Sequence, residues 1–289
     1  MTFRALLILI AALVFQSACT FGPKYQRPDV PAPVTYRGAA AQPSEESLGD
    51  AKWWTVFQDE ELQKLIRSAL TNNFDVRIAA ARIVQAQSQL GITRADQFPT
   101  INGTGSAGRQ RNPSNPVFPA FEANLSQLGL SAAWQLDFWG RYRRATEAAR
   151  ATLVASDWGR KAVIGTLVSN LATSYFQLRE MDLELETARR ILAARRESLE
   201  LNRTLEQGGA IAGIDVLQAE ILVEQAARQI PDLERRATQQ ENLISILLGR
   251  NPDAVTRGRA LTDQTLPPQI PAGLQSSLVE RRPDIRQAA

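Results

Sequence analysis

Cys19 has the most distinctive side-chain chemistry in this sequence, because it is the only cysteine among 289 residues. A single thiol cannot form a disulfide within its own chain. The sequence contains no histidine, which removes the usual general base, the commonest transition-metal ligand and every pairing of serine or cysteine with histidine. We therefore expect no enzyme activity, no catalytic residues, no metal site and no cofactor.

The segment in front of Cys19 is typical of a secretory signal peptide. Arg4 supplies a positive charge, and residues 5–15 form an uninterrupted apolar run. This run is too short to span a bilayer as a helix, but it suits the apolar core of a signal peptide. The sequence therefore predicts a signal peptide over residues 1–18.

The position of Cys19 resembles that of the lipidated cysteine of bacterial lipoproteins, which becomes the diacylated mature N-terminus. Gln16 departs from that pattern, which usually has leucine three positions before the cysteine. Thr20 follows the cysteine, whereas an aspartate there would resemble the signal for retention in the inner membrane. The resemblance implies a lipid anchor at Cys19 and sorting to the outer membrane. An ordinary cleaved signal with an unmodified thiol stays open as the alternative.

Residues 19–58 combine this anchor with a proline-rich stretch. Five prolines lie among glycine, alanine and serine between residues 20 and 50. A segment of this composition cannot pack a core and favours an extended chain. We predict a tether that joins the anchor to the body of the protein.

A helical segment, which could be broken near Asn72-Asn73, and two strands are predicted next. Apolar residues recur at three- and four-residue steps over residues 59–96, which is typical of helices. Residues 99–109 and 121–138 instead alternate between two faces, which is typical of strands. In the second strand, large apolar side chains occupy one face, and small or polar side chains occupy the other.

Two explanations of this strand pair stay open. In a soluble protein, the apolar face would lie on a core. The strand length, and the aromatic residues Trp134, Phe138 and Trp139 near one end, instead match a transmembrane strand and its membrane girdle. Two strands cannot lie in lipid with open edges, so the second explanation requires further strands from the rest of the protein or from other subunits.

Two long helices follow the strands. They are predicted over residues 141–206 and 214–248, with a glycine-rich tip at residues 207–213 between them. Sustained three- and four-residue spacing of apolar residues predicts that the two helices pair as an antiparallel coiled coil. Residues 249–273 are proline-rich and are predicted to form a linker.

The end of the sequence repeats an earlier pattern. Asp284 matches Asp75 at an offset of 209, and an arginine and two alanines match at the same offset. Similarity at a fixed offset is typical of an internal repeat. We therefore predict that residues 59–248 form a first repeat and that residues 274–289 begin a second, truncated one.

Six short motifs occur in order along the chain. They are Gly22–Pro28, Trp53-Trp54 with Phe57 and Asp59, Trp134–Arg141, Asp215–Glu220, Leu247–Gly249 and Arg281–Ile285. Together they resemble the TolC-like outer-membrane efflux proteins, in their lipoprotein (NodT/OprM-type) branch. The resemblance covers essentially the whole chain, and the predicted order of elements is that family's repeat unit.

The resemblance implies a fold that is mainly α with a β-hairpin. Long antiparallel coiled-coil helices would form an α-helical barrel, and the strands would contribute to a trimeric transmembrane β-barrel. The implied function is the outer-membrane channel of a tripartite efflux system in a Gram-negative bacterium, which exports small molecules or drugs. The implied partners are the other protomers of a homotrimer, a periplasmic adaptor (membrane fusion protein), an inner-membrane pump and outer-membrane lipid. Residues 1–289 alone are expected to be incomplete as a duct.

Four residues at the helix tip are the candidates for binding the adaptor: Gly208, Gly209, Gly213 and Asp215. Small residues would let a partner approach the tip closely. Glycine could equally serve the turn itself, and aspartate could cap the second helix. Both roles stay open for these residues.

The overall composition favours no nucleic acid as a partner. The net charge is +3, and the basic residues are scattered along the chain, which is typical of solvated helix faces. A periplasmic coiled-coil adaptor lipoprotein remains the alternative function, because it would explain Cys19 and residues 141–248. It would not explain the two alternating segments.

Overall fold

The computed structural model describes residue 26 and residues 53–114, 116–117, 119–264 and 281–289. The predicted signal peptide, Cys19, most of the predicted tether, the last nine residues of the predicted linker and the first seven of the predicted second repeat lie outside this part. The chain divides into two compact units. We refer to Arg82–Ser156 as the strand unit, and to the described residues of Val30–Ala81 and Asp157–Ala289 as the helical unit.

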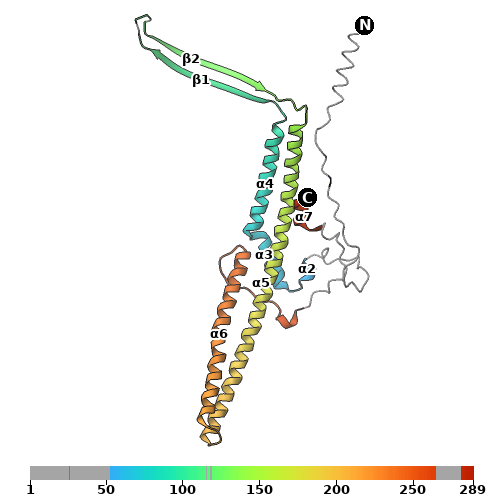
Figure 1. Cartoon of the computed structure of the whole chain (residues 1–289), viewed down its shortest axis with the longest axis vertical. Coiled ribbons are helices and arrows are strands. Elements are labelled where there is room, and N and C mark those ends of the chain that lie inside the picture. The colour runs from blue at the N-terminus through green and yellow to red at the C-terminus, as the bar shows by residue number, and fades with distance from the viewer. Residues whose placement is uncertain (1–25, 27–52, 115, 118, 265–280) are drawn as a thin grey trace. The chain divides into compact units, whose positions relative to one another are not determined.

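The strand unit contains one antiparallel sheet of two strands, β1 (Thr100–Asn112) and β2 (Phe121–Ala133) (Figure 1). The register pairs the first residue of β1 with the last residue of β2 and continues without a break to the other end. Both strands are exposed over nearly their whole length. Main-chain pairing, rather than a core, therefore holds them together.

The second strand is shorter than its sequence predicts. β2 ends at Ala133 and not at residue 138, because its partner strand begins at Thr100 and offers nothing further to pair with. Trp134 leaves the sheet, and its Nε1 donates to the carbonyl of Gln97 at 3.2 Å. The alternation that continues beyond the strand in the sequence therefore does not correspond to sheet structure.

Two helical segments adjoin the sheet in the strand unit. They belong to α4 (Phe74–Ala95) and α5 (Arg141–Gln207), which both continue into the helical unit. Gln97 links the end of one to the start of the other, because its side-chain amide donates to the Tyr142 carbonyl and the Thr146 hydroxyl. Among the described residues, no helix has the length and apolar character needed to cross a bilayer.

In the helical unit, α5 and α6 (Gly213–Leu247) run antiparallel (Figure 1). Their sequence-predicted ranges differ from the observed ones by one residue at the ends. Buried side chains recur along both helices at the predicted three- and four-residue steps. They are Val168, Leu171, Tyr175, Leu178, Leu192 and Leu199 of α5 and Val216, Ala219, Val223, Ala226, Leu233, Ala237 and Ile244 of α6. Burial of this apolar seam is the main source of stability in the unit.

The chain is helical earlier than the predicted tether allows. α2 (Trp53–Val56) and α3 (Glu60–Asn72) precede α4, whereas the sequence predicts an extended chain up to residue 58. The difference arises because Trp53 and Phe57 pack against the core of the helical unit.

Asn73 divides the helical segment predicted over residues 59–96 into α3 and α4, at the position where the sequence allows a break. Its side-chain oxygen accepts from the N–H of Asp75 at 2.8 Å and of Val76 at 3.2 Å. Side-chain capping of this kind competes with continuation of the preceding helix. The Asn73 amide also donates to the carbonyl of Leu247 at 2.9 Å, so one side chain fixes the start of α4 and the end of α6.

Gly249 ends α6 in the left-handed conformation, with a φ of 68°. The N–H groups of Gly249 and Arg250 donate to the carbonyls of Ile246 and Ser245 at 2.9 and 3.1 Å, which is a Schellman motif. A Cβ at Gly249 would lie 2.5 Å from the carbonyl oxygen of Asn72. Only glycine therefore permits α6 to end this close to the end of α3.

The described part of the predicted linker packs against the core. Val255 is 2% exposed, and a short 3₁₀ helix, η2, covers Leu261–Asp263. After the part that is not described, α7 (Pro283–Ala288) begins 209 residues after Phe74, the first residue of α4. The offset of the repeated sequence pattern is therefore also the offset between two helix starts.

Candidate interaction sites

One face of the sheet in the strand unit is apolar. Side chains alternate between the faces of a strand, and the register puts Leu128 and Leu130 on the same face as Ile101. These three side chains are 92, 80 and 68% exposed. Away from the turn, the opposite face carries Thr100, Asn102, Thr104 and Ser106 of β1 and Gln127, Gly129 and Ser131 of β2, and near the turn it carries Leu125 and Phe121. Away from the turn, exposed apolar side chains on one face lie opposite a polar stretch, which indicates a surface that binds lipid or protein.

The three predicted girdle residues follow directly on the end of β2. Trp134, Phe138 and Trp139 are 60, 63 and 72% exposed, so they are not core residues of this chain. The rings of Phe138 and Trp139 meet edge to face, with their centroids 6.0 Å apart. The strand unit thus has an aromatic cluster, Trp134–Trp139, directly after the end of β2.

Asp137 lies within this aromatic cluster and accepts a hydrogen bond from the first turn of α5. Its Oδ2 accepts from the N–H of Arg143 at 3.0 Å, and the Arg143 guanidinium lies 3.5 Å from the same oxygen. Desolvation raises the pKa of Asp137, but hydrogen bonds from the N–H groups of Arg143 and Tyr142 outweigh it, so the pKa is lowered. The charged carboxylate stabilises the first turn of α5.

The tip between α5 and α6 is a Schellman turn at Gly209, whose φ is 71°. The N–H groups of Gly209 and Ala210 donate to the carbonyls of Glu206 and Leu205, each at 2.8 Å. These bonds satisfy the last carbonyl groups of α5 and let the chain reverse. Gly209 is thus required by the turn.

The other predicted tip residues differ in whether the fold requires them. Asp215 accepts from the N–H of Ala212 at 3.2 Å, and this bond stabilises the first turn of α6. A Cβ at Gly208 would meet no atom closer than 3.6 Å, and one at Gly213 would meet only the flexible side chain of Glu206, at 3.1 Å. The turn therefore does not require glycine at Gly208 or Gly213, although both are exposed at the tip.

A buried polar hub that the sequence pattern did not predict joins α3, α5 and the chain after α6. Asp59 is 1% exposed, and its Oδ1 accepts from two N–H groups in the first turn of α3. Its Oδ2 accepts from the Tyr175 hydroxyl at 3.1 Å. The same oxygen accepts from the Arg259 N–H at 3.1 Å and the Gln264 amide at 2.8 Å. The Tyr175 hydroxyl in turn accepts from the N–H of Gly258 at 2.8 Å.

This hub shifts the pKa values of both of its acids. Burial raises the pKa of Asp59, but hydrogen bonds from Gln264, the Leu62 N–H and Tyr175 outweigh it, so the pKa is lowered. Burial, with the charge of Asp59 adding to it, raises the pKa of Tyr175 to about 12. At neutral pH a carboxylate therefore accepts from a neutral phenol, which suits a permanent structural link.

A second polar cluster fastens the chain after α6 to both long helices. The Nε of Arg257 lies 3.3 Å from the Oδ2 of Asp182 in α5, and its Nη1 pairs with Glu241 in α6. Glu241 also accepts from the N–H of Val255 at 3.1 Å. Together with the hub, this cluster makes the described part of the linker an integral part of the helical unit.

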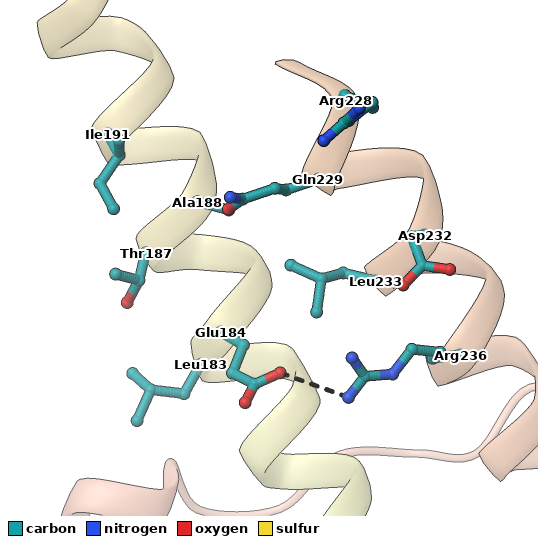
Figure 2. A pocket seen from close by; sticks show the side chains of 10 residues that line it. All are labelled: Leu183, Glu184, Thr187, Ala188, Ile191, Arg228, Gln229, Asp232, Leu233 and Arg236. Carbon is teal, nitrogen blue, oxygen red and sulfur yellow. Dashed lines mark ion pairs between the residues drawn. The ribbon is translucent and has the colours of Figure 1, made fainter. Parts of the chain in front are cut away.

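A groove of about 720 Å³ lies between α5 and α6. Figure 2 shows Leu183, Thr187 and Ile191 along its α5 wall. Glu184 and Arg236 pair across it, with 3.8 Å between nitrogen and oxygen (Figure 2). Because its walls combine apolar side chains with charges of both signs, we assign no ligand to it.

The predicted site residues thus fall into separate groups. The four tip residues lie where α5 ends and α6 begins in the helical unit, and the three girdle residues lie in the aromatic cluster of the strand unit. Cys19 lies outside the described residues.

Known proteins resemble this chain in both sequence and fold. The family model described as "Outer membrane efflux protein" matches residues 65–250. The probable efflux pump outer membrane protein TtgC of Pseudomonas putida is 32% identical over 293 residues, which cover 99% of this chain and 60% of TtgC. The cation efflux system protein CusC of Escherichia coli K12 is 30% identical over 274 residues, which cover 94% of this chain and 59% of CusC.

The solved structure of the outer-membrane channel OprN matches with a TM-score of 0.79 at 31% identity, over 93% of this chain and 61% of that one. This match confirms the predicted fold class, mainly helical with one strand pair. The chain spans about 60% of the length of the curated relatives it matches. With a family model matched over residues 65–250, the chain belongs to the outer membrane efflux protein family.

Proposed function

We propose that this chain is part of the outer-membrane channel of a tripartite efflux system, which exports small molecules from the periplasm or an inner-membrane pump to the exterior. Its relatives TtgC and CusC are named as an efflux pump outer membrane protein and a cation efflux protein. A duct makes and breaks no covalent bond, so the proposal requires no catalytic residue.

The observation that carries the proposal is the two-faced, exposed strand pair. Leu128 and Leu130 are exposed on one face, while the part of the other face opposite them carries hydroxyl and amide side chains. Apolar side chains outward and polar ones inward are the pattern of a transmembrane β-barrel with an aqueous interior. Because strands with open edges are unstable in lipid, we propose that three copies of the protein combine their strands in one barrel.

The aromatic cluster supports the same arrangement. Trp134, Phe138 and Trp139 lie exposed at the end of β2 from which α5 begins. Tryptophan and phenylalanine are enriched where a barrel crosses the membrane surface. We propose that this cluster marks the periplasmic surface of the outer membrane.

Cys19 is proposed to be the lipid anchor of the protein. Two or more acyl chains suffice for stable attachment to a bilayer, whereas one chain binds only weakly. The variant Cys19→Ala is expected to accumulate as an unprocessed precursor in a Gram-negative host. Normal maturation of this variant would show that the cysteine is not the processing site.

The tip is proposed to bind the periplasmic adaptor. Gly209 and Asp215 have structural roles in the turn, but Gly208 and Gly213 have room for a larger side chain. A partner that packs closely on the tip would explain glycine at those two positions. The variants Gly208→Leu and Gly213→Leu are therefore expected to leave folding intact and to abolish efflux in cells.

The alternative, a periplasmic adaptor with a coiled-coil hairpin, would use α5 and α6 in a similar way. It has no role for β1 and β2, or for the exposed apolar face that they carry. The family match to outer membrane efflux proteins also favours the channel.

Conductance tests the proposed function. The complete gene product, reconstituted into planar bilayers, is expected to conduct ions and to cross-link as a trimer. The variant Leu128→Asp with Leu130→Asp should not insert, because charges on the lipid-facing side of a barrel strand are strongly unfavourable. A monomeric, non-conducting product that stays in the aqueous fraction would contradict the proposal.

A further inference from the structure

The apolar face of the sheet becomes basic towards the turn between the strands. On β1 the residues of this face are Ile101, Gly103, Gly105, Ala107, Arg109 and Arg111. We propose that Arg109 and Arg111 bind phosphate-bearing lipid head groups at the membrane surface opposite the aromatic cluster. This inference rests on the proposed function, because it requires that the apolar face meets lipid.

The register puts both arginines on the lipid-facing side. Arg109 pairs with Asn124 and Arg111 pairs with Glu122, on the same face as the pair of Gly105 and Leu128. An even number of residues separates these positions along each strand, and side chains alternate with a period of two. The guanidinium groups therefore project from the same face as the exposed leucines, outside the proposed pore.

The distance along the strand agrees with the thickness of a membrane. Ten residues lead from Thr100, which pairs with the last residue of β2, to Arg109. A tilted strand needs about 9–11 residues to cross a bilayer. If the aromatic cluster lies at one surface of the membrane, Arg109 lies at the other, where the lipid phosphates are.

The charges are arranged to attract an anion. Arg109, Arg111 and Glu122 are the only charged residues in the sequence from 98 to 133. Glu122 accepts from Arg109 and lies 3.4 Å from the Nε of Arg111, so one carboxylate is shared by two guanidinium groups and the cluster is positive. The arginine side chains are 72 and 77% exposed.

One ion pair with Glu122 requires only one of these two arginines. An exposed ion pair contributes only about 0–1 kcal/mol, and one arginine would be enough to form it. Two guanidinium groups held side by side by Glu122 offer several unused N–H donors in a planar geometry that matches phosphate oxygens.

Lipid retention by the complete protein tests this inference. The protein would be placed in nanodiscs of phosphatidylcholine with added diphosphorylated lipid A, and the lipid A bound per protomer would be counted by native mass spectrometry. Each basic residue beside an anionic membrane surface contributes a factor of about five in affinity. The double variant Arg109→Gln with Arg111→Gln is therefore expected to lower lipid A binding at least about fivefold.

Two further variants keep the test independent of folding and of total charge. Arg94→Gln with Arg150→Gln removes two exposed arginines from the helices of the same unit and is expected to leave lipid A binding unchanged. Glu122→Gln removes the shared carboxylate and is expected to increase binding. An increase cannot result from damage to the fold.

Three results would overturn the inference. Equal lipid A binding by the wild type and the double arginine variant, with both inserted in the nanodiscs, would overturn it and leave the proposed function intact. Complete displacement of lipid A by inorganic phosphate would assign the site to free phosphate. A wild-type protein that does not enter the nanodiscs would contradict the proposed function and the inference together.

Discussion

The helical unit and the strand unit differ in where their side chains find partners. In the helical unit, Leu171 and Tyr175 are fully buried, and Asp59 uses both carboxylate oxygens in hydrogen bonds. In the strand unit, Leu128 is 92% exposed and the sheet has two open edges. The helical unit is thus stabilised by its own residues, whereas the strand unit has surfaces suited to lipid and to further strands.

Substitution of Asp59 should have the largest effect on stability. In Asp59→Ala, α3 loses its N-cap and the donors of Tyr175, Arg259 and Gln264 lose their acceptor, which is expected to cost about 4 kcal/mol. Urea unfolding of the purified chain, followed by far-ultraviolet circular dichroism, measures this loss. Asp137→Ala is the matched control in the strand unit, where loss of a more exposed carboxylate that accepts from the first turn of α5 should cost clearly less. Equal losses of unfolding free energy in the two variants would contradict the greater dependence of the helical unit on its own contacts.

The next largest effect on stability is expected from substitution of Gly249, compared with Gly209, which has almost the same φ. Gly249→Ala is expected to cost about 3 kcal/mol, because it combines left-handed strain with a Cβ too close to Asn72. Gly209→Ala at the exposed tip has the strain without the contact and should cost about 1 kcal/mol. The difference between the two unfolding free energies isolates the close approach of α6 to α3. If both variants lose the same amount, that approach does not stabilise the helical unit.

The buried Tyr175 predicts a loss of stability in alkali. Its pKa of about 12 in the folded chain lies above its ordinary value of 10.0, so the folded chain keeps this proton to a higher pH than the unfolded chain. The stabilisation is complete below pH 10 and should decrease by about 2 kcal/mol as the pH rises through 12. Unfolding midpoints measured across this range test it. Tyr175→Phe, although less stable overall, should lack this component of the pH dependence.

The smallest effect is expected on the apolar face of the sheet. Leu128→Ala should change the unfolding free energy by less than about 0.5 kcal/mol, because the side chain is exposed in the chain. Leu171→Ala makes the same truncation in the seam of the helical unit and should cost about 3 kcal/mol. A large loss in Leu128→Ala, in the absence of lipid, would show that the strand unit has a core of its own.

The sequence predicted the long-range pattern of the helical unit better than its polar contacts. Three- and four-residue spacing identifies the seam, because burial imposes that period on the sequence. The hub was missed because Asp59 and Tyr175 lie 116 residues apart, and no local pattern links them. An aspartate directly before a helix that starts with two glutamates does signal an N-cap, and a tyrosine in an apolar seam signals a hydroxyl that needs a partner.

The limits of the strand prediction have a different physical cause. Alternation continues past Ala133 in the sequence, but a strand ends where its partner ends, and a single-strand pattern does not contain the register. The tip was located by its glycines, yet the sequence could not separate Gly209, which the turn requires, from Gly208 and Gly213. That distinction depends on backbone angles and on the space around each residue.

Spin-label accessibility on the two faces of the sheet shows directly whether the strand pair spans the membrane. Single cysteines at Leu128 and at Thr104, on opposite faces, would be labelled in the complete protein in outer-membrane vesicles, with the unsubstituted protein as the control for Cys19. If the strand pair spans the membrane, the label at position 128 is relaxed mainly by oxygen, which partitions into lipid, and the label at position 104 mainly by a water-soluble nickel complex. Equal access of the nickel complex to both labels would contradict a membrane-spanning strand pair.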